Sequence, residues 1–185
     1  MKRKILIIDN DTGAMKDLKE VLKNEDFKII NFRIFKTEQA RKFTHIILTG
    51  GDYRVNMKKF SEEVRLIRNP TAPILGICYG MQLIAKSFGS NLRVLEKLNK
   101  GNIYINILRK DKLFIKIPRK IKVFEYRQYA VKKTGKDLRI LATSDYGIEA
   151  IKHYKLPVWG VQFHPEVIFE NERAGRGLIK NFLKL

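Results

Sequence analysis

The sequence is poor in the residues that build disulfide frameworks, metal sites and membrane spans. It has one cysteine and three histidines among 185 residues. One cysteine cannot form an internal disulfide, and no Cys/His cluster has zinc-ligand spacing. No apolar run approaches the roughly 18 residues that cross a bilayer, and no small-residue cleavage site follows the basic start MKRK. These absences predict a cytoplasmic protein with no metal or other cofactor.

Acidic residues are scarce as well. There are 19 Asp and Glu against 38 Lys and Arg, which gives a formal net charge of +19. The excess is concentrated between Lys97 and Arg139, where a stretch, KIPRKIKVF, alternates apolar and basic residues as a half-exposed strand does. We interpret this charge as a solvated basic face or as a docking surface for an acidic partner protein. Contact with a polyanion such as nucleic acid is the alternative.

The first half of the chain alternates apolar strands with amphipathic helices. The predicted strands cover Lys4–Asp9, Lys28–Phe35, His45–Thr49 and Pro73–Ile77. The predicted helices cover Met15–Leu22, Met57–Arg68 and Gly80–Phe88. Continuous apolar runs are typical of buried parallel strands. The pattern therefore predicts an α/β fold with a doubly wound, mostly parallel, flavodoxin-like sheet.

The middle of the chain changes to short strands separated by turn residues. These strands are predicted at Ile103–Leu108, Leu113–Ile117, Ile121–Tyr126 and Tyr129–Lys132, and they indicate a small antiparallel section. Further strands follow at Arg139–Thr143, Gly147–Lys152 and Val158–Phe163, before an amphipathic helix from about Arg173 to Leu183. No linker or repeat interrupts the pattern, and the length suits a single domain over residues 1–185.

The one cysteine lies between two glycines in the segment PILGICYGMQ. Gly76 and Gly80 stand two residues on either side of Cys78, between a predicted strand and a predicted helix. This is the layout of a G-x-S-x-G nucleophile elbow with sulfur in place of oxygen, where glycines avoid clashes at a sharp turn. The N-terminus of the next helix favours a thiolate. Cys78 is a candidate nucleophile, and an inert core thiol is the alternative.

A thiolate nucleophile needs a base, and His164 is the best placed of the three histidines. His45 and His153 lie where a structural or solvated role is expected, whereas His164 ends the last predicted strand, at the same sheet edge as Cys78. Glu166 is close enough to accept a hydrogen bond from the second imidazole nitrogen. A Cys…His-x-Glu set at one sheet edge is typical of thiol acyl transfer. A structural His-Pro turn is the alternative.

Three motifs together resemble a known family. They are GICYGMQ at 76–82, GVQFHPE at 160–166 and, upstream of both, LTGG at 48–51. In combination they are similar to the class I (triad-type) glutamine amidotransferases, and most similar to the separate glutaminase subunits of archaeal-type GMP synthases. The resemblance covers nearly the whole chain. It implies hydrolysis of L-glutamine and delivery of the ammonia to a separate synthetase subunit, of the ATP-pyrophosphatase type.

The resemblance also implies a role for each catalytic residue. Cys78 would attack the side-chain amide of glutamine and form a γ-glutamyl thioester. The backbone N–H groups of Gly51 and Tyr79 would hold the oxyanion. His164, oriented by Glu166, would protonate the departing ammonia and then activate water.

The substrate-binding positions follow the family less closely. Gln82 matches a substrate-binding glutamine, and Tyr126, Gln128 and Tyr129 lie in a loop whose backbone helps hold glutamine in the family. GMP synthase glutaminases usually carry a Ser-His pair and an acidic residue there, and Arg127 stands where the histidine would be. The resemblance implies that the side chains of this loop face the partner protein.

These departures keep two other functions open. The chain could serve another synthetase, such as one of the anthranilate or aminodeoxychorismate type. It could also be a basic regulatory or binding protein that has retained the fold. After the third strand, Asp52 stands in place of the proline of the usual Gly-Gly-Pro. This departure also favours service to another synthetase.

Overall fold

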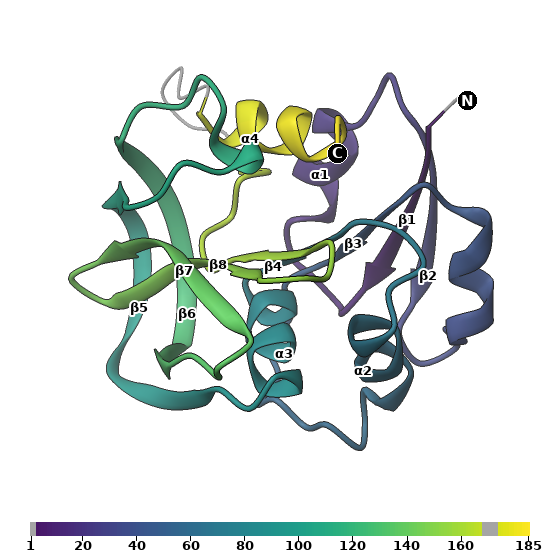
Figure 1. The fold of residues 1–185 in the computed structure, drawn as a ribbon, viewed down its shortest axis with the longest axis horizontal. Helices are drawn as coiled ribbons and strands as arrows, with labels where there is room; N and C mark the ends of the chain where they lie inside the picture. Colours follow the sequence, from purple (N-terminus) through teal and green to yellow (C-terminus); the bar gives the residue numbers. More distant parts are fainter. Residues whose placement is uncertain (1–2, 168–173) are drawn as a thin grey trace.

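A single sheet runs through the protein and combines a parallel and an antiparallel half (Figure 1). The structure is a computed structural model that describes residues 3–167 and 174–185, and in these residues nine strands form the sheet, in the order β2-β1-β3-β4-β9-β8-β6-β5-β7. The parallel strands are β2 (Asp26–Asn31), β1 (Lys4–Asp9), β3 (His45–Leu48), β4 (Ile74–Ile77) and β9 (Val158–Val161). Their carboxyl ends meet at one edge of the sheet.

Helices cover both faces of the parallel half because its strands are apolar on both sides. In β1, Ile5 and Ile7 pack in one core cluster with Leu18 of α1 (Met15–Val21) and with α4 (Ala174–Phe182). Leu6 and Ile8 pack in a second cluster with α2 (Ser61–Arg68) and α3 (Tyr79–Ser87). Alternate strand residues point to opposite faces, so α1 and α4 lie above the sheet in Figure 1 and α2 and α3 below it. A 3-10 helix, η1 (Thr37–Lys42), lies between β2 and β3 in the chain.

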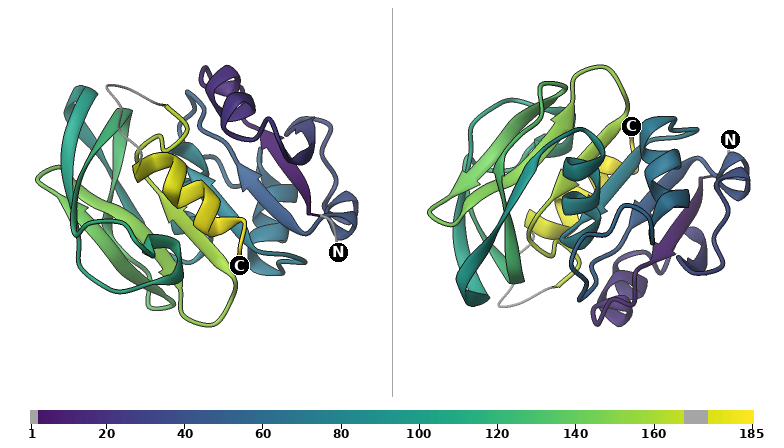
Figure 2. Two further views of the ribbon diagram at one scale, coloured as in Figure 1. Left: turned by 90° about the horizontal axis from the view of Figure 1, so that it is seen from above. Right: turned by 90° about the horizontal axis from the view of Figure 1, so that it is seen from below.

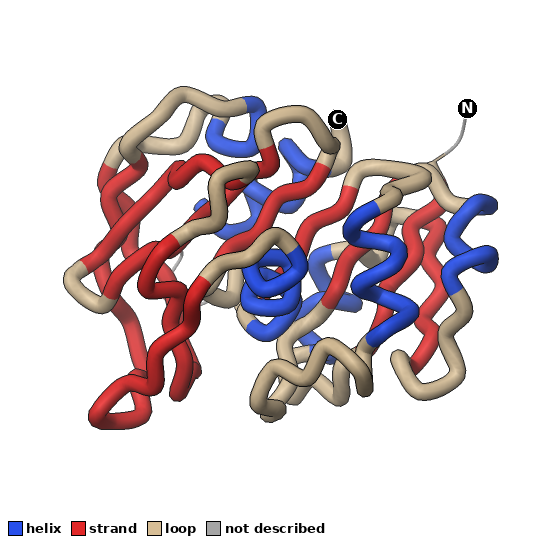
Figure 3. Tube along the Cα trace, turned by 60° about the horizontal axis from the view of Figure 1, so that its bottom comes forward, coloured by secondary structure: helices blue, strands red, loops and turns tan. Residues whose placement is uncertain are grey.

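The antiparallel half closes on itself into a four-stranded barrel (Figures 2 and 3). Each of its strands pairs with two others, in the cycle β8 (Gly147–His153), β6 (Lys120–Lys133), β5 (Asn91–Ile107), β7 (Leu138–Ser144) and back to β8. β8 also pairs antiparallel with β9, which joins the barrel to the parallel half. This antiparallel half is larger than the small section that the sequence predicts.

The sequence pattern locates the parallel elements well and errs at their ends. The strand predicted at Lys28–Phe35 is β2 and ends at Asn31, because the carbonyl of Asn31 accepts from the N–H groups of Ile34 and Phe35 and turns the chain. The helix predicted from Met57 begins at Ser61, since the Asn56 side chain accepts from two backbone N–H groups and forms a turn first. Arg173, the predicted start of the last helix, lies outside the described residues.

The barrel contains the larger errors. The strand predicted at Leu113–Ile117 is wrong: Lys112–Phe114 is a short 3-10 helix, η2, which Asp111 caps by accepting from the Leu113 N–H at 3.0 Å. Lys116 has a φ of 58°, which a strand does not allow. The two strands predicted between Ile121 and Lys132 are one strand, β6, and the first part of β5 was not predicted.

Two features of the described residues bear on membrane and metal binding. Among the helices within residues 3–167 and 174–185, none is long and apolar enough to cross a membrane. The same residues hold no group of three or more His, Cys, Asp or Glu side chains placed to share a metal ion.

Candidate active site

Cys78 lies on a sharp turn between β4 and α3, with a φ of 49°. A non-glycine residue with positive φ is strained and persists only where its surroundings enforce it. The flanking glycines allow the turn. A Cβ at Gly76 would lie 2.5 Å from the carbonyl carbon of Gly80, and one at Gly80 would lie 2.5 Å from the carbonyl oxygen of Leu48. The Cys78 N–H donates to the carbonyl of Val161 at 2.8 Å, which fixes the turn against β9.

His164 lies beside Cys78 and is oriented by Glu166. The Nδ1 of His164 is 2.9 Å from Oε1 of Glu166, and both side chains are buried. The backbone N–H of His164 donates to the carbonyl of Phe124 at 2.9 Å, which anchors the residue to β6. Burial lowers the pKa of His164, but the Glu166 carboxylate and the charge and hydrogen bond of Cys78 outweigh it and hold that pKa well above its usual value. The imidazolium form of His164 is therefore favoured.

Gly50 and Gly51 bring the end of β3 against the same two side chains. A Cβ at Gly50 would lie 3.1 Å from Cε1 of His164 and 3.7 Å from the Cβ of Cys78. A Cβ at Gly51 would lie 2.2 Å from the carbonyl oxygen of Asn10. The missing side chains therefore let the backbone pass close to Cys78 and His164 at Gly50 and close to Asn10 at Gly51.

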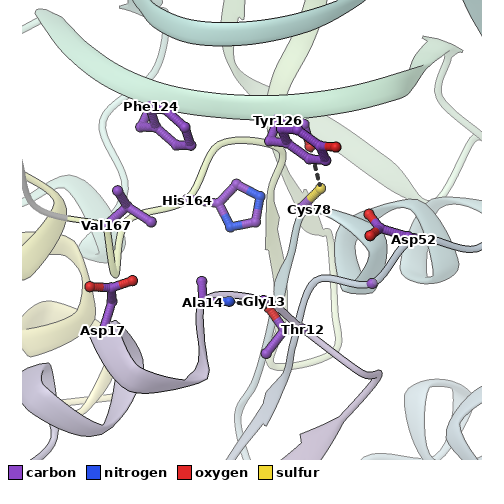
Figure 4. Close-up of a pocket in the computed structure, with 11 residues that line it drawn as sticks. Thr12, Gly13, Ala14, Asp17, Asp52, Cys78, Phe124, Tyr126, His164 and Val167 are labelled. Carbon is purple, nitrogen blue, oxygen red and sulfur yellow. Dashed lines mark hydrogen bonds between the residues drawn. The ribbon is translucent and has the colours of Figure 1, made fainter.

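Two cavities meet at Cys78. The first, of about 420 Å³, lies on the side of His164 and is lined also by the turn after β1, by Phe124 and by Tyr126 (Figure 4). The second, of about 360 Å³, lies on the side of Gln82 and is lined by the β6 residues from Tyr126 to Tyr129 and by Leu98 of β5. Gly51, Asp52, Cys78 and Tyr126 line both cavities. The cysteine therefore faces two spaces, one open to the histidine and one open to the barrel.

The residues expected at the substrate site take up different positions. Gln82 is buried, and its amide donates to the carbonyl of Tyr129 at 3.2 Å and to Oε1 of Gln162 at 3.2 Å. The Gln128 amide donates to the carbonyl of Leu95 at 2.7 Å, so that side chain is tied to β5. Tyr126 is half-exposed at the rim, and its carbonyl is 3.6 Å from the Cys78 sulfur, which donates to it.

Tyr79 points away from the cavities. Its ring is buried, packs against Phe60 and Tyr53, and lines neither cavity. Its backbone N–H opens the helix directly after Cys78. Within the described residues, the backbone N–H groups of Tyr79 and Gly51 have no hydrogen-bond acceptor. Both are thus available to a ligand at the cysteine.

Gln162 belongs to the site and was not predicted from the sequence. Its side chain is fully buried, and its amide donates to the Cys78 sulfur at 3.5 Å. Gln162 stands two residues before His164 in the segment that continues β9. Strand residues two apart share a face. The spacing of Gly160, Gln162 and His164 could therefore have placed Gln162 in the site.

The expectation that the loop side chains face a partner is wrong for Arg127. Its side chain is buried inside the barrel, 2.6 Å from a carboxylate oxygen of Glu149 and 3.0 Å from one of Glu125. The physical reason is the strand alternation of β6: Ile121, Val123, Glu125 and Arg127 share the inward face. The apolar residues of that face are the signal in the sequence from which a buried position for Arg127 could have been inferred.

The loop after β1 packs against the loop after β3 through charges. Arg33 makes two hydrogen bonds to the carboxylate of Asp11, at 2.8 and 2.5 Å, and a third to the hydroxyl of Tyr53 at 2.8 Å. The Tyr53 hydroxyl also donates to Asp11. Hydrogen bonds from Arg33 and Tyr53 hold the pKa of Asp11 far below its usual value. These contacts brace the loop that carries Gly51 and Asp52.

Comparison with known proteins agrees with this geometry. The family model for glutamine amidotransferase class-I matches residues 6–185. The chain belongs to the class I glutamine amidotransferases. It is 40% identical over 141 residues to one subunit of the glutamine-hydrolysing GMP synthase of Pyrococcus abyssi, over 76% of this chain and 74% of that protein. It is 42% identical over 148 residues to the corresponding subunit from Thermococcus kodakarensis, over 80% and 78% of the two chains.

Solved structures of this amidotransferase family share the fold. A protein from Thermoplasma acidophilum, similar to the same GMP synthase subunit, aligns with a TM-score of 0.90 at 26% identity, over 100% of this chain and 94% of that one. A glutamine amidotransferase from Thermotoga maritima aligns with a TM-score of 0.78 at 20% identity, over 100% and 97%. Both alignments cover the whole of this chain, and so they include its barrel as well as its parallel strands.

Proposed function

We propose that this chain is a glutaminase subunit that hydrolyses L-glutamine at Cys78 and delivers the ammonia to a separate GMP synthetase subunit. The observation that carries the proposal is the strained cysteine, raised on its turn beside a buried His164–Glu166 pair at the meeting point of two cavities. The family membership of the chain supports glutamine as the substrate, and its likeness to GMP synthase subunits supports a GMP synthetase subunit as the partner.

In the first half-reaction, the Cys78 thiolate attacks the side-chain carbonyl carbon of glutamine. The oxygen becomes an oxyanion. The N–H groups of Gly51 and Tyr79, which have no acceptor within residues 3–167 and 174–185, are the candidates to hold it. The C–N bond then breaks as His164 gives its proton to the leaving nitrogen. The products are ammonia and a γ-glutamyl thioester on Cys78.

In the second half-reaction, the now neutral His164 takes a proton from water, which attacks the thioester. Glutamate leaves and the cysteine is restored with His164 again protonated. Glu166 touches neither substrate nor sulfur in this scheme. It keeps Nδ1 protonated and stabilises the imidazolium, as the acid does in a Ser-His-Asp triad.

The cavity bordered by Gln82 and β6 is the proposed glutamine pocket. It gathers the residues that the sequence assigned to substrate binding, which are Gln82, Tyr126, Gln128 and Tyr129. The Gln82 and Gln128 amides are bound to protein acceptors, so we assign these two side chains to the shape of the pocket and assign substrate hydrogen bonding to backbone groups.

The experiment is reconstitution with the ATP-pyrophosphatase subunit from the same organism, with XMP and ATP. We expect GMP formation with glutamine as the nitrogen source, and with free ammonium as well. The Cys78→Ala complex should keep the ammonium-dependent activity and lose the glutamine-dependent one. A folded complex that uses ammonium but never glutamine would contradict the proposal. If another type of synthetase co-purifies with the native chain, the proposed glutaminase activity would stand and the proposed GMP synthetase partner would be replaced.

A further inference from the structure

The barrel contains a buried charge cluster directly behind the proposed glutamine pocket. Arg127 of β6 lies between Glu125 of the same strand and Glu149 of β8, and the exposed fraction of all three side chains is 0%. The Arg127 Nη2 donates to Oε1 of Glu149 at 2.6 Å, and the Ser144 hydroxyl donates to the same oxygen at 2.6 Å. Asn99 of β5 donates to Glu125. The cluster therefore ties several strands of the barrel together.

The cluster is close to neutral at physiological pH. Burial, followed by the hydrogen bond and charge of neighbouring Glu149, raises the pKa of Glu125 to about 10, although Arg127 opposes this. Glu125 thus keeps a proton, and one guanidinium faces one carboxylate. Such buried pairs add little net stability because desolvation offsets the attraction, but removing one partner is costly. Their effect is to favour one geometry over others.

That geometry is needed because the strand pairing is interrupted here. β5 and β6 pair regularly up to Asn99 opposite Arg127 and resume at Val94 opposite Tyr129. The four residues of β5 between them bulge away and face only Gln128. On its other side, β6 pairs with β8 through Val131 and Ile148 alone among the described residues. The ladder with β5 therefore stops at Arg127 and resumes at Tyr129, and Gln128 between them has no regular strand partner.

The β6 residues on both sides of this interruption, from Tyr126 to Tyr129, form the wall of the pocket. Its carbonyls make the contacts to the reactive residues: Tyr126 accepts from the Cys78 sulfur at 3.6 Å, and Tyr129 accepts from Gln82 at 3.2 Å. Because side chains alternate along a strand, an Arg127 held inward presents Tyr126 and Gln128 to the cavity. A β6 free to shift by about 1 Å would move these groups out of register with the bound substrate.

We propose that Arg127 is a positioning residue for glutamine: where the strand pairing is interrupted, its ion pair with Glu149 and its contact with the neutral Glu125 hold the pocket wall beside Cys78. The inference rests on the proposed glutaminase activity. Arg127 does not touch the reacting atoms, so its loss weakens glutamine binding and leaves the cysteine reactive.

The test uses Arg127→Met and Arg127→Lys, with Arg139→Met as the matched control. Arg139 of β7 also pairs with a buried carboxylate, that of Asp111 directly before η2, at 2.8 Å, but lines neither cavity. The readouts are kcat and KM for glutamine, and the rate at which iodoacetamide, a small electrophile that needs no glutamine pocket, alkylates Cys78. All are measured on the complex with its synthetase subunit.

We expect Arg127→Met to raise KM about tenfold or more, with kcat and the alkylation rate within about threefold of wild type. Arg127→Lys keeps the charge but cannot bridge two carboxyl groups as the planar guanidinium does, so its KM should be intermediate. Arg139→Met should leave all three quantities unchanged. A general loss of stability would not raise KM while leaving kcat and the alkylation rate near their wild-type values.

Two results would overturn the inference. One is a folded Arg127→Met protein with the wild-type KM, and the other is a parallel loss of alkylation and turnover. Should Arg127→Met fail to fold, the variant Glu125→Met/Arg127→Met/Glu149→Met leaves no unpaired buried charge. It is expected to show the same rise in KM, and a wild-type KM there would equally overturn the inference. Wild-type protein without glutaminase activity would instead remove the proposed function, and the inference with it.

Discussion

The two halves of the sheet keep their polar groups in opposite places. In the parallel half, the strand interiors are almost wholly apolar, and polar residues gather where the strands end, with Asn10 after β1 and Cys78 after β4. In the barrel, ionisable groups lie inside, where Glu125, Arg127 and Glu149 are completely buried. The reactive cysteine lies on the border between these halves. The parallel half supplies the histidine, which follows β9, and the barrel supplies the pocket lined by β6.

This difference separates two tasks. The parallel half brings the reactive groups together because parallel strands end at a common edge. The barrel builds the wall against which a substrate is held, and an interrupted strand pairing makes that wall depend on side-chain contacts. Damage to the parallel half should therefore stop the chemistry, whereas damage to the barrel should weaken the fit of the substrate.

The largest effect is expected from Cys78→Ala, which removes the nucleophile of the parallel half. Glutamine hydrolysis should fall by at least about 1,000-fold. The fold should remain, because the variant removes one sulfur atom next to two cavities and leaves the backbone of the turn unchanged. A glutaminase assay beside a thermal melt checks this, and residual activity within about tenfold of wild type would show that Cys78 is not the nucleophile.

Gly80→Ala should damage the same half through packing. The added Cβ would lie 2.5 Å from the carbonyl oxygen of Leu48, where neither backbone can yield easily. We expect a loss of about 3 kcal/mol in the free energy of unfolding, measured by urea denaturation, and a large loss of activity.

Gly177→Ala is the matched control for that substitution. It lies within α4, where the added Cβ makes only an ordinary contact with Ile117 at 3.9 Å. It should raise stability by up to about 1 kcal/mol, since alanine favours a helix over glycine. Equal losses in the two variants would refute the steric account of the turn.

Glu166→Gln should act through His164 and lower kcat/KM about 100-fold. The Glu166 carboxylate is the main group that raises the pKa of His164. Because the imidazolium is the acid that releases ammonia, activity is lost as pH rises through this pKa. Removing the carboxylate lowers the pKa of His164, so the alkaline limb of the kcat/KM profile should move to lower pH. An unchanged limb would assign that limb to another group.

The smallest effect is expected at Glu63 of α2, a buried carboxyl of the parallel half that contrasts with the paired cluster of the barrel. Burial raises its pKa to about 8, and the Asn10 amide donates a hydrogen bond to it at 3.2 Å. The folded protein therefore holds a proton that the unfolded chain releases above its ordinary pKa of 4.5. Stability should fall as pH rises from 4.5 to 8 for this reason.

Glu63→Gln should remove this pH dependence. At about pH 5 the variant and wild type should have similar free energies of unfolding, and at about pH 8 the variant should be more stable by about 2 kcal/mol. The gain is less than the full linkage, because a buried amide must satisfy its own hydrogen bonds. Urea denaturation at the two pH values checks the difference, and a constant gap between the proteins would contradict it.

The same division of the sheet explains what could be read from the sequence. The bounds of β1 were predicted to the residue, because a short run of apolar side chains between polar residues is typical of a buried parallel strand. The nucleophile turn, His164 and Glu166 followed from spacing. β5 was missed over its first part because long stretches of it are exposed on both faces and carry no alternation.

Burial of charge was the other obstacle. Sequence reasoning places an arginine such as Arg127 at the surface, because isolated buried charges are costly. Its partner Glu149 comes from another strand, so the pairing that makes burial tolerable is invisible along the chain. The inward alternation of Ile121 and Val123, extended by four residues, was the one local signal.

The most direct test of the account is intact-mass and peptide mass spectrometry after treatment with diazo-oxo-norleucine, a glutamine analogue that alkylates glutaminase cysteines. It requires both a reactive Cys78 and a pocket that accepts glutamine. We predict one adduct, located on Cys78, blocked by excess glutamine and absent from Cys78→Ala. An unmodified Cys78 in the assembled complex, under conditions that label a related glutaminase, would contradict the account.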